Sequence, residues 1–223
     1  MLMNHLSDYE FIKKDFVKKL TENNTKLRED YKEYKINPNN CDIPKIRDIE
    51  MITLYVTGFD MIHKDPQGID GYDTKSGTYA EVKCINIDTL SYDFHVTATN
   101  NVFERYENKK IWYIITLWNN FTHETVGYII GRYKDMIEDM NRQHGKYINN
   151  LSRKKQCRFT LRHLIDDLKF TVVNVRYSAE EVMKLLESRN RYHNFRCEDI
   201  IPIEKFIFDK NFLKRYNEKE KSR

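Results

Sequence analysis

The chain has 223 residues, of which 32% are charged, and its formal net charge is only +4. This length suffices for one sizeable core, and no apolar run approaches the length of a membrane span. The N-terminus lacks the form of a signal peptide, and the four cysteines lack the close pairing of a zinc site. We therefore expect a cytoplasmic protein with reduced thiols and no membrane partner. The small positive charge is compatible with nucleic-acid binding but does not establish it.

The first part of the chain, residues 1–57, is expected to consist of helices. Residues 7–10 fit a capping box, and apolar residues recur after them at helical spacing. A further helix is predicted to open with Asp42 and Pro44 and to end at Gly58. Glu50 lies on this helix.

The middle part of the chain, residues 58–135, is expected to form the core sheet. Its centre is a predicted hairpin, in which β-branched and aromatic residues alternate on both sides of a turn at residues 74–77. Other strongly β-forming runs cover residues 59–63, 111–118 and 125–130. A central mixed sheet of about five strands is therefore predicted.

The last part, residues 136–223, is expected to be largely helical and basic. The pattern predicts an amphipathic helix over residues 133–148, a strand over residues 169–175 and a helix that opens at a capping box beginning with Ser178. With the core sheet, these elements predict a single domain of the α/β (α+β) class, with helices flanking the sheet.

The predicted hairpin gathers three polar groups. Glu81 and Lys83 are two residues apart, so the pleat points both side chains to one face, while Val82 and Cys84 point to the other. Asp70, in the preceding strand, is expected to lie close to Glu81. Two carboxylates beside one ammonium favour an added cation, and oxygen ligands suit Mg²⁺ best. The alternative is an exposed cross-strand pair of Glu81 and Lys83.

Asp70 followed by Glu81-Val82-Lys83 after a turn resembles the signature of the PD-(D/E)XK nuclease superfamily, to which most type II restriction endonucleases belong. The place that is usually proline is Ile69 here, and either Asp70 or Asp73 could be the first acid. Asp70 is preferred, because an aspartate at the start of a turn often bonds its own backbone.

The resemblance implies a restriction-endonuclease-like core and a Mg²⁺-dependent endonuclease that cuts double-stranded DNA at specific sequences. Asp70, Glu81 and the backbone carbonyl of Val82 would hold the metal, and Lys83 would act on the attacking water. Glu50 is a further candidate ligand, with an exposed helix-surface acid as the alternative. A homodimer is expected, because a palindromic site is read most simply by a two-fold protein.

Three segments are candidate DNA contacts. Hydroxyls and amides follow the hairpin, basic residues interleave with apolar ones further on, and the third segment is rich in arginine and asparagine, the side chains that favour guanine and adenine. Ordinary loops and solvated charge runs are the alternatives. The candidates are Thr97, Thr99, Asn100 and Asn101; Arg153, Lys154, Lys155 and Arg158; and Arg189, Asn190, Arg191 and Asn194.

Two other functions remain open at this point. A junction resolvase or repair nuclease would use the same residues on structured DNA. A non-catalytic DNA-binding module would carry Asp70, Glu81 and Lys83 only as surface groups and would have no reason to bind Mg²⁺ there.

Overall fold

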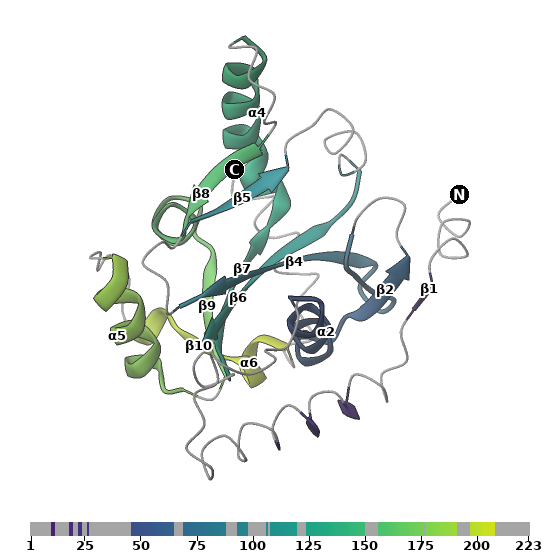
Figure 1. Cartoon of the computed structure of the whole chain (residues 1–223), viewed down its shortest axis with the longest axis vertical. Helices are drawn as coiled ribbons and strands as arrows, with labels where there is room; N and C mark the ends of the chain where they lie inside the picture. Colours follow the sequence, from purple (N-terminus) through teal and green to yellow (C-terminus); the bar gives the residue numbers. More distant parts are fainter. Residues whose placement is uncertain are drawn as a thin grey trace.

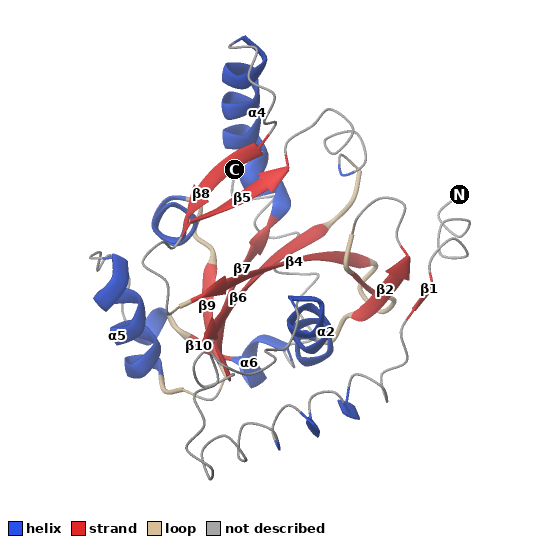
Figure 2. Ribbon diagram, viewed as in Figure 1, coloured by secondary structure: helices blue, strands red, loops and turns tan. Residues whose placement is uncertain are grey.

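The fold is given by a computed structural model (Figures 1 and 2). It describes residues 10–11, 18–19, 22–23, 26, 46–64, 69–87, 93–97, 106, 108–119, 124–149, 156–175, 177–190 and 197–207.

A mixed sheet of eight strands forms the centre of this part of the chain. The pairs β4–β6 and β9–β10 are parallel, and the other neighbours are antiparallel. In order across the sheet, the strands are β1 (Glu10–Phe11), β2 (Asp60–Lys64), β3 (Gly71–Asp73), β4 (Thr78–Asn86), β6 (Ile111–Asn119), β7 (Glu124–Arg132), β9 (Thr171–Asn174) and β10 (Ile201–Pro202).

One face of the sheet is covered by helix α2 (Ile46–Thr57) and the short helix α6 (Ile203–Ile207). Leu54 of α2 and Ile203 of α6 pack there against alternate residues of the central strands, among them Val82. Gly58 ends α2 with a φ of 86°, a left-handed conformation that glycine adopts without strain.

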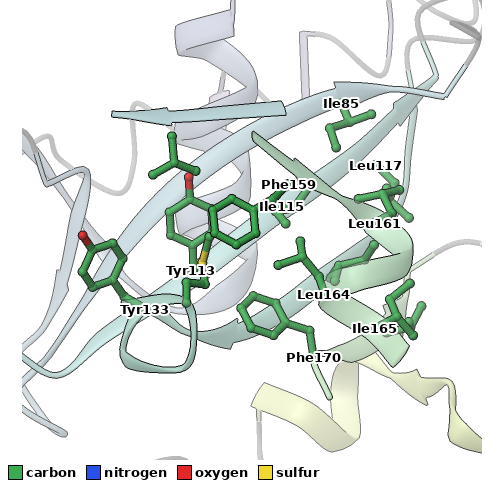
Figure 3. Packing of buried hydrophobic residues seen from close by; sticks show 14 of the residues in the cluster. Ile85, Tyr113, Ile115, Leu117, Tyr133, Phe159, Leu161, Leu164, Ile165 and Phe170 are labelled. Atoms are coloured by element: carbon green, nitrogen blue, oxygen red, sulfur yellow. The ribbon is translucent and has the colours of Figure 1, made fainter. Parts of the chain in front are cut away.

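The opposite face is covered by α4 (Tyr133–Asn149), α5 (Ala179–Asn190) and a second, two-stranded sheet of β5 (Asp93–Thr97) and β8 (Gln156–Thr160). A π-helical turn (His163–Asp167) follows β8, and a 3₁₀ turn (Cys197–Asp199) precedes β10. Figure 3 shows this core, in which sheet residues such as Ile115 and Leu117 face Phe159 and Leu164. Because both faces are covered, β6 is buried from Ile111 to Trp118, as its continuous apolar run predicts.

The structure confirms the predicted class, an α+β fold with a central mixed sheet flanked by helices. The helix that ends at Gly58, the hairpin, the strands at residues 111–118 and 125–130 and the helices α4 and α5 are also confirmed. None of the described helices combines the length and apolar character needed to cross a bilayer.

Three expectations need correction. The sheet has more than about five strands: the strand predicted over residues 169–175 joins it as β9, and β1 and β10, at two residues each, are too short for a clear alternation. Glu10 and Phe11 form β1 rather than the start of a helix, because their backbone pairs with β2. Residues 58–135 do not lie wholly in the core sheet, because β5 pairs with β8 in the smaller sheet.

Candidate active site

Asp70 lies where β3 joins the sheet, and its backbone is fixed on both sides. Its carbonyl accepts a hydrogen bond from Ile62 N at 2.9 Å, and its N–H donates to the Ala80 carbonyl at 3.1 Å. Its side chain continues the pairing with β4, because Oδ2 accepts a hydrogen bond from Val82 N at 2.8 Å. The Asp70 carboxylate is thereby held against the middle of β4.

Asp73, the other candidate for the first acid, bonds the backbone of the turn that follows it. Its carboxylate accepts hydrogen bonds from Lys75 N at 3.0 Å and from Ser76 N at 3.1 Å. These bonds close the turn between β3 and β4, where Gly77 has a φ of 67°. The geometry therefore favours Asp70 over Asp73 as the acid available for chemistry.

Glu81 and Lys83 form an ion pair on one face of β4. Lys83 Nζ lies 2.7 Å from Glu81 Oε1 and also donates to the Val82 carbonyl at 3.2 Å. Glu81 is only 9% exposed, whereas Lys83 is half-buried. The alternative of an exposed surface pair therefore does not hold for Glu81.

The Val82 carbonyl is part of the same arrangement. Within a strand, the N–H and C=O of one residue point to the same edge. Because the Val82 N–H bonds to Asp70, the Val82 carbonyl faces the Asp70 side of β4. Glu81 and this carbonyl thus present oxygen atoms to the Lys83 ammonium, and the Asp70 carboxylate lies on the same side of β4, bonded to the Val82 N–H.

Burial and mutual repulsion dominate the electrostatics of the two acids. Burial, together with the charge of Glu81, raises the pKa of Asp70 from 3.8 to about 7, although the Val82 N–H and Lys83 oppose the shift. Burial also raises the pKa of Glu81, against the opposing effect of Lys83. For Lys83, burial acts to lower the pKa, but the carboxylates of Glu81 and Asp70 outweigh it and raise the pKa overall.

Glu50 adds to this negative charge from α2. It is half-buried, and its charge contributes to the upward pKa shifts of Asp70, Glu81 and Lys83. The structure therefore places Glu50 within electrostatic reach of the hairpin, which argues against an isolated acid on the helix surface.

The oxygen atoms at this site suit a hard divalent cation. Among the described residues, no three His, Cys, Asp or Glu side chains are close enough together to hold a metal ion by themselves. The candidate set instead has two carboxylates and a backbone carbonyl, and water and phosphate oxygens would have to complete the octahedron that Mg²⁺ prefers. A divalent cation would also relieve the repulsion that raises the pKa of Asp70.

Glu81 has a further partner, Tyr106, that the sequence did not predict. Tyr106 O–H donates to Glu81 Oε2 at 3.4 Å, and its ring packs edge-on against Tyr133. Tyr113 lies beside Glu81 in the parallel β4–β6 register. The aromatic character of residue 106 gave no sign of this contact, since 25 residues separate Tyr106 from Glu81.

Of the predicted DNA contacts, only some fall in the described part of the chain. Arg158 is exposed on β8, opposite His95 of β5, and it alternates with the buried Cys157 and Phe159. Thr97 ends β5, and Arg189 and Asn190 end α5, but the side chains of these three are not described. Outside the described residues lie Thr99, Asn100, Asn101, Arg153, Lys154, Lys155, Arg191 and Asn194.

Comparisons with models of known protein families and with curated proteins find no match for this chain. The likeness of the hairpin to a nuclease motif therefore depends on its own residues and geometry.

Proposed function

We propose that the chain is a Mg²⁺-dependent endonuclease that hydrolyses phosphodiester bonds of double-stranded DNA at specific sequences, in the manner of a type II restriction enzyme. The observation that carries the proposal is that three side chains gather at Val82: Asp70 bonds the Val82 N–H, and Lys83 bonds both the Val82 carbonyl and Glu81. The order of α2, β2, β3 and β4 also supports it, since it is the order that the PD-(D/E)XK resemblance implies.

Asp70, Glu81 and the Val82 carbonyl would hold the cation, and Glu50 would add charge from α2. A bound Mg²⁺ supplies Lewis-acid polarisation of the scissile phosphate and lowers the pKa of a water ligand. The protein's part is to keep the two carboxylates close together despite their repulsion, which the backbone bonds of Asp70 and the burial of Glu81 achieve.

Lys83 would act on the reacting groups. Its ammonium is half-buried and already lies among the candidate ligands, 2.7 Å from Glu81 Oε1. From this position it would orient the attacking water and offset the negative charge that develops on the phosphate in the transition state. It is the only one of the three candidate catalytic side chains that carries a positive charge.

The assembly and the DNA surface are part of the same proposal. A homodimer would place one hairpin at each strand of a palindromic site. The exposed Arg158, on the β5–β8 sheet, would bind phosphates while Cys157 and Phe159 anchor the strand in the core.

Incubation of the full chain with long duplex DNA of known sequence, in Mg²⁺ or in EDTA, tests the proposal. We expect discrete fragments that require Mg²⁺, and we expect Lys83→Ala to lower the cleavage rate by about 10²- to 10³-fold, which is the scale for removal of one transition-state contact. DNA binding by Lys83→Ala, measured by gel shift, should be retained.

A normal cleavage rate in Lys83→Ala would show that the mechanism is wrong. Cleavage of four-way junctions but not of duplex DNA would indicate a structure-specific nuclease. DNA binding without any cleavage or Mg²⁺ uptake would indicate a non-catalytic module.

A further inference from the structure

The carboxylate of Glu81 is held from two directions by different residues. Its Oε1 atom is paired with Lys83 Nζ at 2.7 Å, and its Oε2 atom accepts the hydrogen bond from Tyr106 O–H at 3.4 Å. Rotation of the carboxylate about its terminal bond would break both the Oε1–Lys83 contact and the Oε2–Tyr106 hydrogen bond. Oε1 therefore faces the side of Lys83 and the Val82 carbonyl, where the metal is proposed to bind.

Tyr106 is itself fixed in place. Tyr106 is 7% exposed, and its ring packs edge-on against Tyr133 with 4.9 Å between the ring centres. Its backbone carbonyl accepts a hydrogen bond from Lys109 N at 3.1 Å, in the turn that leads into β6. Tyr133, the first residue of α4, is 2% exposed and lies in the core that Figure 3 shows.

We propose that Tyr106 is a positioning residue for Glu81: its hydroxyl occupies Oε2, so that Oε1 alone is presented to the divalent cation. This inference rests on the proposed nuclease function and deepens it. Tyr106 contacts neither the cation nor the DNA, and it acts only through the orientation of Glu81. Hydrogen-bond partners of metal-binding carboxylates typically change metal affinity or activity by about 10- to 100-fold when they are removed.

A purely structural role for Tyr106 makes a different prediction. The ring fills space against Tyr133, and Tyr106→Phe would preserve that packing. If packing were the whole role, loss of the hydroxyl would leave metal binding unchanged.

The structure offers a matched control for the loss of the hydroxyl. Tyr133 belongs to the same aromatic cluster, and its buried hydroxyl has no hydrogen-bond partner among the described residues. Tyr133→Phe therefore removes a hydroxyl from the neighbouring ring without removing a hydrogen bond to Glu81. Tyr106→His, which keeps an N–H donor in a smaller ring, tests for partial rescue.

The experiment measures Mn²⁺ binding to the full chain by the electron paramagnetic resonance signal of free Mn²⁺. Wild type, Tyr106→Phe, Tyr106→His and Tyr133→Phe are compared, with Asp70→Asn as the variant that lacks a metal ligand. We expect Tyr106→Phe to raise the Kd about 10-fold or more, Tyr106→His to recover part of the loss, and Tyr133→Phe to change it less than about two-fold.

The outcomes separate the inference from the function on which it rests. If wild type binds Mn²⁺ and Asp70→Asn does not, but Tyr106→Phe binds like wild type, the role of Tyr106 is wrong and the metal site stands. Equal weakening by Tyr106→Phe and Tyr133→Phe would also overturn it, because both would then act through packing or folding. If wild type binds no Mn²⁺, the proposed function fails and the inference fails with it.

Discussion

Two groups of buried charges in this chain are built in opposite ways. The side chains of Arg132 and Asp135, where β7 meets α4, are each 2% exposed and form an ion pair of opposite charges. Arg132 donates to Asp135 from Nε at 3.0 Å and from Nη2 at 2.6 Å. At the hairpin, by contrast, Asp70 and Glu81 share one lysine, and Glu50 adds a further negative charge.

We interpret the balanced pair as serving the fold and the hairpin cluster as serving the proposed metal binding. A fork-shaped arginine that satisfies both oxygens of one carboxylate leaves little for an added ion to improve. An excess of buried carboxylates is unfavourable for the folded protein by itself and becomes favourable only when a cation is added. The pKa of Asp70 is raised to about 7 first by burial and then by the charge of Glu81, with a further contribution from Glu50.

The largest expected effect is at the balanced pair. Arg132→Met removes the cation that bonds both oxygens of the buried Asp135 carboxylate, and we expect the free energy of unfolding to fall by about 3–5 kcal/mol. Urea unfolding measures the change. The double variant Arg132→Met/Asp135→Leu should recover much of the loss, because an apolar pair can replace a buried ion pair. A loss below about 1 kcal/mol in the single variant would contradict a structural role for this pair.

A smaller effect, of opposite sign, is expected at the hairpin. Asp70→Asn keeps an oxygen that can accept the Val82 N–H but removes the charge that Glu81 repels. In EDTA near pH 8, we expect the free energy of unfolding to rise by about 1–2 kcal/mol, as measured by urea unfolding.

The expected gain in stability of Asp70→Asn follows from how the stability of wild type depends on pH. The folded-state pKa of Asp70 is raised from 3.8 to about 7, so the folded protein binds this proton more tightly than the unfolded chain. The stability of wild type should therefore fall as the pH rises from about 4 to about 7, and Asp70→Asn should remove that part of the fall. A variant that differs from wild type by the same amount at about pH 5 and about pH 8 would show that the Asp70 charge is not the cause.

The hairpin could be predicted because the residues that specify it lie close together in the sequence. Residues that alternate across a turn specify two paired strands, and the pleat then places Glu81 and Lys83 on one face. Asp70 follows from the same register, since its carboxylate reaches Val82 across the hairpin.

The features that could not be predicted depend on distant parts of the chain. Tyr106 contacts Glu81 only because β6, which follows Tyr106, pairs with β4. Likewise, β5 pairs with β8 although a long segment separates the two strands in the sequence. The burial of Glu81 also depends on this packing, so the sequence left open a surface pair that the structure does not have.

The most direct test is the effect of Mg²⁺ on stability near pH 8, in wild type and in Asp70→Asn. If the excess carboxylates are a metal site, excess Mg²⁺ should raise the free energy of unfolding of wild type by about 1–3 kcal/mol relative to EDTA. Asp70→Asn should gain almost nothing, because it lacks a ligand and the repulsion that the cation relieves. No gain in wild type, or the same gain in both proteins, would contradict a metal site at the hairpin.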